Sequence, residues 1–212
     1  LLAVWQPRIT YKIMAGADMR APADLRGRRL GVADVGGSSD FAAQYFLDKY
    51  GLRRGEDVVI LSLGSQTERL GGLEAGAIHA AMLNAPFTAA ARQRGFHAIF
   101  DYAEEDYEVA NSGLVTTRAY QQAQPAVARG MVTAIVDAVH YFKTEQQGTL
   151  EVIGRFLQQD DPTVLRELYE ESAGRALAEV PYPSARGLTN VIAQVATANA
   201  AAGRLRAEDL ID

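Results

Sequence analysis

Small residues that can donate hydrogen bonds gather in the run Gly36-Gly37-Ser38-Ser39. Glycine lets a ligand approach the backbone, and a serine hydroxyl can donate to an anionic or carbonyl oxygen. The run lies between a predicted strand and a predicted helix, where free backbone N–H groups and the helix dipole favour such oxygens. An ordinary helix cap, in which Ser38 or Ser39 bonds its own helix, is the alternative interpretation.

Two further strand-to-helix junctions carry polar side chains. Gln66 can both donate and accept hydrogen bonds, which suits a polar small molecule. The preceding Ser65 pairs with Glu68 in the pattern of a capping box, so Ser65 itself is predicted to cap the helix. At the third junction Asn84 can hydrogen-bond a ligand and Phe87 can form a wall, although a cap and a core aromatic explain this pair equally well.

Four more residues are candidates outside these junctions. Asn111 and Ser112 precede a predicted strand and are candidate ligand contacts. Gly16 and Gly113 are candidate hinges, because closure concentrates backbone change in a few residues. Equally, those glycines can simply end strands.

No pattern for catalysis or metal binding is visible. The histidines at 79, 97 and 140 are not at metal-ligand spacing, and the acidic run 104–106 is predicted to be a solvated loop. The chain has no cysteine, which excludes disulfides, zinc thiolate sites and thiol catalysis. It also has no Gly-x-Ser-x-Gly elbow. We therefore expect no catalytic residues, no metal and no cofactor.

The composition is that of a soluble globular protein. The 212 residues are 48% hydrophobic and 22% charged, enough for one large domain or two small lobes. A net charge of −5, with both signs interspersed, gives no indication of a nucleic-acid surface. No apolar run reaches the roughly 18 residues that a membrane span needs.

The junctions must be positioned by alternating strands and helices. This alternation predicts right-handed βαβ crossovers and a parallel sheet, in which ligands collect at the carboxyl ends of the strands. The remainder is mostly helical. Strands are predicted at 9–15, 29–33, 58–61, 78–83, 97–100 and 113–117, and helices at 41–50, 66–75, 87–94, 125–142, 150–157, 162–173 and 185–200.

Four phrases of the chain form a specific combination: residues 22–32 (PADLRGRRLGV), 36–41 (GGSSDF), 73–81 (LEAGAIHAA) and 113–118 (GLVTTR). Together they resemble the nitrate/sulfonate/taurine (NMT1-like) family of periplasmic solute-binding proteins. The resemblance extends from about Ile9 to Asp212.

The resemblance implies an α/β fold of the type II periplasmic-binding class, with two α/β lobes joined by two crossover strands. On that template residues 1–19 form the end of the first lobe and the first crossover strand. Residues 20–110 form the second lobe. Residues 111–212 form the second crossover strand and the C-terminal helices of the first lobe, whose N-terminal side is expected to be incomplete.

The implied function is that of the substrate-binding component of an ABC importer, which captures a small polar or anionic solute between its lobes. Its expected partners are a small-molecule ligand and an ABC permease in the membrane, and no nucleic acid. A monomer is expected, in the periplasm or lipid-anchored outside a Gram-positive cell. Because the three junctions lack Arg and Lys, a charged solute would rely on neutral donors, and neutral or zwitterionic solutes remain open.

Two alternatives use the same fold. One is the effector-sensing domain of a LysR-type transcription regulator, which a helix-turn-helix segment upstream would indicate. The other is an enzyme similar to the pyrimidine-precursor synthases or the menaquinone-pathway lyases, which would need a histidine, cysteine or acidic group in the cleft.

Overall fold

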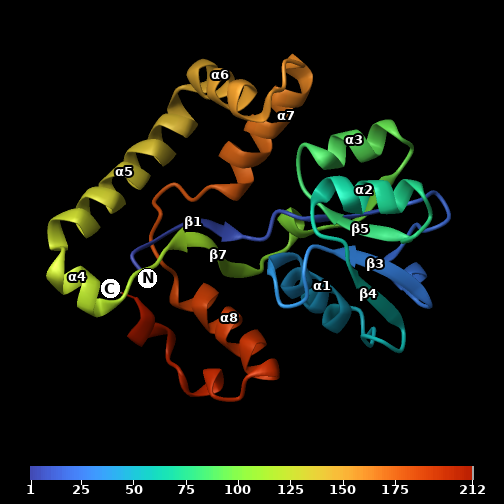
Figure 1. Cartoon of the computed structure of the whole chain (residues 1–212), viewed down its shortest axis with the longest axis horizontal. Helices are drawn as coiled ribbons and strands as arrows, with labels where there is room; N and C mark the ends of the chain where they lie inside the picture. Colours follow the sequence, from blue (N-terminus) through green and yellow to red (C-terminus); the bar gives the residue numbers. More distant parts are fainter. Residues whose placement is uncertain (212) are drawn as a thin grey trace. The chain divides into compact units, whose positions relative to one another are not determined.

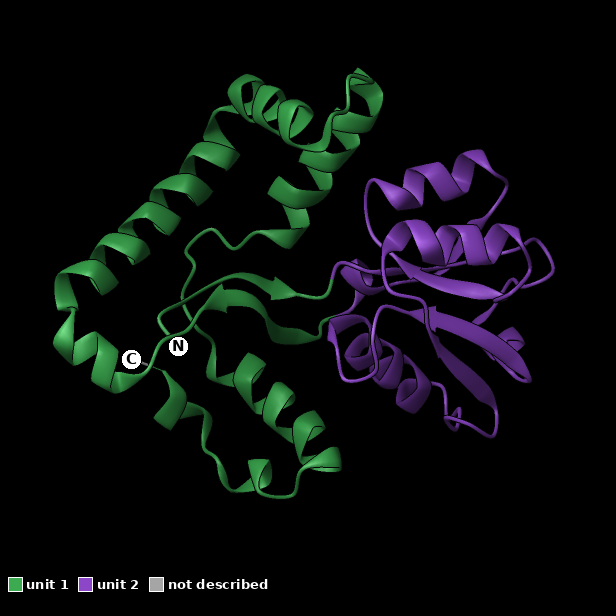
Figure 2. Ribbon diagram, in the orientation of Figure 1, with its two compact units in different colours: residues 1–9, 106–212 green, residues 10–105 purple. Residues whose placement is uncertain are grey.

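The computed structural model describes residues 1–211 and divides into two compact units (Figure 2). Unit 1 consists of Leu1–Ile9 and the chain from Asp106 onward, and unit 2 consists of Thr10–Glu105. The chain therefore passes between the units twice, after Ile9 and after Glu105. Both passages come earlier in the sequence than the lobe boundaries after residues 19 and 110 that the resemblance implies.

Unit 2 is built on a five-stranded mixed sheet (Figure 1). The two strands beside β3 (Arg28–Val32) run parallel to it, as the alternation of strands and helices predicts, but β2 (Lys12–Ala15) runs antiparallel between its neighbours. The sheet is therefore not purely parallel. In sheet order the strands are β4 (Val58–Ser62), β3 (Arg28–Val32), β5 (Ala80–Leu83), β2 (Lys12–Ala15) and β6 (His97–Asp101).

Each parallel strand leads into a helix, as predicted. A helix starts earlier than expected only after β3, because Gly37 serves as its N-cap and both serines fall within its first turn. The helices are α1 (Ser38–Lys49), α2 (Gln66–Glu74) and α3 (Phe87–Gln93), with short 3-10 turns η1 (Pro22–Leu25) and η2 (Tyr102–Glu104).

An aromatic cluster packs α1 against β6. The rings of Phe46 and Phe100 meet edge to face, with centroids 5.1 Å apart. The rings of Tyr102 and Phe100 also meet edge to face, with centroids 4.7 Å apart, and the Tyr102 hydroxyl donates to the carbonyl of Ala42 at 2.6 Å. Phe46 is fully buried. A second cluster, on α2, α3 and the strands, includes the buried Leu73.

The strand predicted at 9–15 is shorter in the structure, where it is β2 (Lys12–Ala15), and a strand that was not predicted, β1 (Ala3–Arg8), precedes it on the other side of the passage between the units. Gln6 and Pro7 obscure the strand pattern of β1, since proline is depleted in strands. β1 pairs antiparallel with β7 (Glu108–Leu114).

The strand predicted at 113–117 begins and ends earlier, as β7. It cannot continue to Thr117, because this side chain caps the next helix by accepting the N–H of Tyr120 at 3.1 Å. The predicted boundary was wrong because the apolar run conceals the cap.

Helices form most of the rest of unit 1, as predicted. Asp161 caps α7 by accepting the N–H of Thr163 at 2.8 Å, with proline in the first turn. In the part described, no helix has the length and apolar character for a membrane span. The elements are α4 (Arg118–Ala123), α5 (Pro125–Thr144), α6 (Gln146–Leu157), α7 (Pro162–Glu171), η3 (Ser172–Ala176), α8 (Ala185–Ala198), η4 (Ala202–Arg204) and η5 (Ala207–Leu210).

Asp57 fixes the loop that enters β4. This carboxylate is only 8% exposed; it accepts the backbone N–H of Arg53 at 2.8 Å and forms an ion pair with Arg26. The Arg53 backbone bond, followed by the Arg53 side chain and the charge of Arg26, lowers the pKa of Asp57 below its ordinary 3.8. A lowered folded-state pKa adds stability above the ordinary value, and this stability is lost as the pH falls through the folded pKa.

We therefore expect Asp57→Asn to lower the thermal midpoint at pH 7, and the gap from wild type to shrink as the pH falls below about 4. Melting curves of both proteins at pH 7, 5 and 3 measure this. An equal gap at every pH would show that the Asp57 charge adds nothing to stability.

Candidate functional site

The three junctions lie together at one edge of the unit 2 sheet. We call residues 33–38, 63–66 and 84–87 the junction edge. β4, β3 and β5 are adjacent and parallel, so their carboxyl ends meet there. The N–H of Gly64 donates to the carbonyl of Ala33 at 3.0 Å, and the N–H of Asn84 donates to the Gln66 side-chain oxygen at 2.8 Å. The junctions are thus directly linked.

The first junction separates the two serines. Ser39 is fully buried, and its hydroxyl accepts the N–H of Ala33 at 2.8 Å, so this side chain serves the fold. Ser38 is exposed, and its hydroxyl lies 3.1 Å from that of Tyr11. Of the two serines, only Ser38 offers its hydroxyl to solvent.

A side chain of α1 fixes the backbone of the first junction. Gly36 has a positive φ of 82°, which favours glycine, and its N–H donates to the carboxylate of Asp40 at 2.8 Å. Asp40 is itself ion-paired with Arg54 at 2.8 Å. The backbone N–H groups of Ser38 and Ser39 have no acceptor within residues 1–211. Because Ser39 is fully buried, only the N–H of Ser38 is available to a ligand.

The second junction shows the predicted capping box. Glu68 donates its N–H to the Ser65 hydroxyl at 3.2 Å, and its carboxylate accepts the N–H of Ser65 at 2.7 Å. Gln66 is half-buried; its side-chain oxygen is used by Asn84, but its side-chain nitrogen finds no acceptor in the described part of the chain. Gln66 therefore offers its side-chain donors to a ligand.

The third junction combines a polar side chain without a partner among the described residues and a core aromatic. The carbonyl of Asn84 accepts the N–H of Phe87 at 2.9 Å, so Asn84 caps α3 through its backbone. Its half-buried side chain makes no hydrogen bond to the described residues. Phe87 is partly buried against the cluster around Leu73, which is the position of a core aromatic.

Sequence reasoning missed Arg69, which changes the chemistry of this edge. The junction residues themselves contain no Arg or Lys, as expected, but the Arg69 side chain reaches the second junction from within α2. Arg69 is 2% exposed; its Nε donates to the carbonyl of Met82 at 2.9 Å, and its Nη1 donates to the carbonyl of Gly64. Burial lowers the pKa of its guanidinium. Residues three apart share a helix face, so the spacing from Gln66 was the available signal.

Asn111 and Ser112 belong to unit 1, not to the junction edge. Both are in β7 and donate to the side-chain oxygen of Gln6 on β1, Ser112 at 2.8 Å and Asn111 at 3.4 Å. They follow the start of their strand instead of preceding it.

Neither candidate hinge lies where the chain passes between the units. Gly16 forms the turn after β2, where its carbonyl accepts the N–H of Met19 at 3.1 Å. Gly113 is inside β7, where a Cβ atom would lie 2.4 Å from the carbonyl oxygen of Ala3. Close approach of two strands accounts for this glycine.

The remaining polar candidates have structural partners. His79 accepts the N–H of Arg29 at 3.2 Å, in agreement with its predicted structural role. The acidic run is not simply solvated, because Glu105 accepts the Tyr45 hydroxyl at 2.8 Å and Asp106 pairs with Arg186 at 3.0 Å. Residues 1–211 contain no group of three side chains placed to hold a metal ion.

Residues 9–156 match the model of the NMT1-like family. No curated protein sequence matches the chain. Among solved structures, the chain is similar to the periplasmic aliphatic sulphonate binding protein SsuA from Escherichia coli, with 14% identity and a TM-score of 0.73, covering 99% of this chain and 68% of that one. The alkanesulfonate-binding protein SsuA from Xanthomonas axonopodis pv. citri bound to MOPS shows 19% identity and a TM-score of 0.72, covering 99% and 69%.

A third similar structure is the desulfurization enzyme DSZB, with 15% identity and a TM-score of 0.63, covering 94% of this chain and 72% of that one. At these identities the similarity shows the fold alone, and it confirms the predicted periplasmic-binding fold. The family match spans well over half of the sequence, from β2 to the end of α6. The protein is therefore a member of the NMT1-like family, as the sequence phrases predicted.

Proposed function

We propose that the protein is the solute-binding component of an ABC importer and takes up a small polar or anionic solute of the nitrate, sulfonate or taurine class. The observation that carries the proposal is the junction edge. It brings together the exposed hydroxyl of Ser38 with the backbone N–H of Ser38 and the side-chain nitrogen of Gln66, the last two of which have no acceptor among the described residues. Such donors suit a solute rich in oxygen acceptors.

The similar structures support this solute class, since two of them are described as binding sulphonates. Directed hydrogen bonds from these donors would orient the solute. Asp40 and Glu68 already place a carboxylate at the N-termini of α1 and α2, which partly offsets the helix dipoles.

As part of this proposal, a monomer works outside the cytoplasmic membrane and delivers its solute to a membrane permease. We propose no nucleic-acid partner, because the net charge is −5. The fold of DSZB favours a second candidate, an enzyme on the same scaffold. Recovery of the bound solute after prolonged incubation, analysed by mass spectrometry, separates the two: a binding protein returns it unchanged.

The two serines provide a test of the site. In a thermal-shift screen of sulfonates, nitrate, taurine, amino acids and pyrimidines, at least one solute should raise the melting point by mass action. We expect Ser38→Ala to reduce that shift while the ligand-free protein stays within about 0.5 kcal/mol of wild type, because this side chain is exposed.

Ser39→Ala is the matched control. It leaves the N–H of Ala33 without its acceptor and should cost about 1–3 kcal/mol of stability. Equal loss of stability in both variants, with solute affinity unchanged by Ser38→Ala, would remove Ser38 from the site.

A further inference from the structure

Arg69 carries a buried positive charge for which the described part of unit 2 supplies no ion-pair partner. The side chain is 2% exposed, and both of its hydrogen bonds end on neutral carbonyl groups, those of Met82 and Gly64. No Asp or Glu of residues 1–211 lies within ion-pair distance of it. Buried charges in proteins are usually paired, because desolvation of an unpaired charge is costly.

The nearby acids favour the charged form of Arg69 without contacting it. Asp34 and Glu68 act on it only through space, and Glu68 is already engaged with Ser65 in the capping box. The Nη2 group of Arg69 also has no acceptor among residues 1–211. Arg69 is therefore left without a contacting counter-ion, and the Nη2 donors are left without an acceptor among the described residues.

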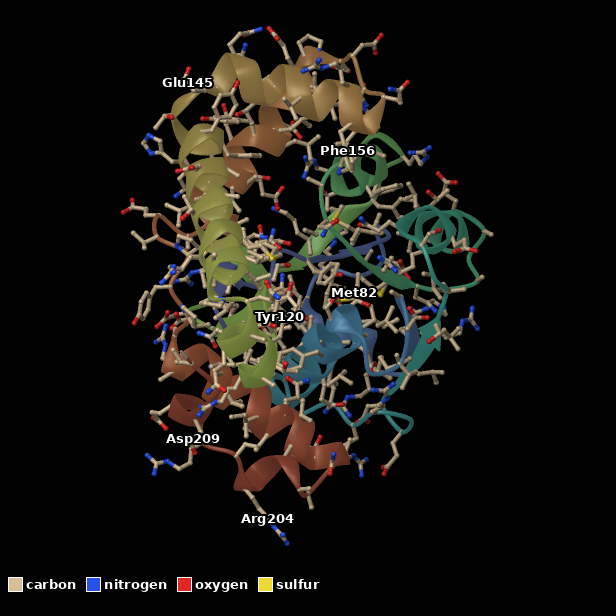
Figure 3. The ribbon with its side chains drawn as sticks, turned by 60° about the vertical axis from the view of Figure 1, so that its left-hand side comes forward. Met82, Tyr120, Glu145, Phe156, Arg204 and Asp209 are labelled. Atoms are coloured by element: carbon tan, nitrogen blue, oxygen red, sulfur yellow. The ribbon has the colours of Figure 1, made fainter. Side chains whose placement is uncertain are left out.

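The guanidinium of Arg69 lies next to the junction edge. Gly64 belongs to the second junction, and Met82, labelled in Figure 3, is next to the last residue of β5. Since β3 lies between β4 and β5, these two contacts place the guanidinium across the end of β3. The first junction follows directly from this strand.

We infer that Arg69 is a specificity-determining residue that makes the junction edge select solutes with an anionic oxygen group over neutral molecules of the same shape. The inference rests on the proposed function and names the solute class for the same site. A bound oxyanion would supply the contacting counter-charge that Arg69 lacks, and charge-assisted hydrogen bonds are the stronger ones. A neutral isostere would leave the buried charge unpaired.

Matched pairs of small probes test the charge preference: methanesulfonate with methanesulfonamide, acetate with acetamide, and nitrate with nitromethane. Titration calorimetry on the full chain measures each affinity. The anion of a pair should bind at least about tenfold tighter than its neutral counterpart. Arg69→Gln should remove most of this preference.

Two further variants keep the test decisive. Arg94→Gln is the matched control, because Arg94 is exposed and pairs with Glu74 on the surface, so the preference should be unchanged. If Arg69→Gln fails to fold, Arg69→Lys retains the charge without the planar fork; it should bind the anion more weakly and still prefer it over the neutral probe.

The outcomes separate the inference from the proposed function. Equal binding of both members of a pair by wild type, or full anion preference in Arg69→Gln, overturns the inference and leaves a solute-binding protein. Equal binding of both members by Arg69→Lys also overturns it. If no probe and no solute of the thermal-shift screen binds wild type, the inference and the proposed function fail together.

Discussion

Phe46→Ala should lower the free energy of unfolding of unit 2 by about 3–5 kcal/mol, which is the usual cost of removing a buried phenylalanine side chain. Phe46 is fully buried, and its ring packs against Phe100 at 5.1 Å and Tyr50 at 5.0 Å. The substitution therefore removes apolar burial and two aromatic contacts, and leaves a cavity between α1 and the sheet.

Urea denaturation followed by near-ultraviolet circular dichroism measures this loss, since the cluster is aromatic. Phe156→Ala is the control: the chemical change is the same, but Phe156 is 85% exposed on α6 and should shift stability by no more than about 0.5 kcal/mol. Similar losses for the two variants would show that the aromatic cluster does not hold α1 in place.

Gly113→Ala should destabilise unit 1 by about 1–3 kcal/mol, the range found when an atom is forced into a packed site. The new Cβ would lie 2.4 Å from the carbonyl oxygen of Ala3, and this oxygen belongs to the backbone of β1. A flexible side chain could move away, but the paired strand can move only by breaking its hydrogen bonds with β7.

Gly130→Ala is the informative comparison. Gly130 lies inside α5, where an added Cβ meets no atom within 4 Å. Alanine is the better helix former, so this variant should gain up to about 1 kcal/mol. Thermal unfolding of the two variants should therefore shift in opposite directions. A neutral or stabilising Gly113→Ala would mean that β1 and β7 can separate at that point without cost.

The parts of the fold that follow from local patterns could be predicted from the sequence. Ser65 and Glu68 are three residues apart, and their capping box forms within one helical turn. The strand-to-helix junctions of unit 2 were found in the same way. Strand pairing cannot be predicted from local patterns, because it depends on segments that are distant in the sequence. The place of β2 between β5 and β6 and the pairing of β1 with β7 were therefore out of reach.

The candidate site shows the same division. Ser38 and Ser39 are adjacent in sequence, yet one faces solvent and the other is buried beneath Ala33, since successive helical residues point about 100° apart. Only the packing of α1 against the sheet decides between them. Arg69 could not be placed from the sequence, because its contacts with the carbonyls of Met82 and Gly64 depend on how α2 packs on the sheet.

The two passages of the chain leave unit 2 from neighbouring strands. Lys12 of β2 is paired with Asp101 of β6, and the N–H of Tyr102 donates to the carbonyl of Tyr11 at 3.1 Å. In unit 1, Arg8 is likewise paired with Glu108. The segment 10–105 thus has the arrangement of an inserted domain, and its two ends are close enough for a short peptide to connect them. Such a module can be exchanged for another in a gene without disturbing the strand pair that receives it.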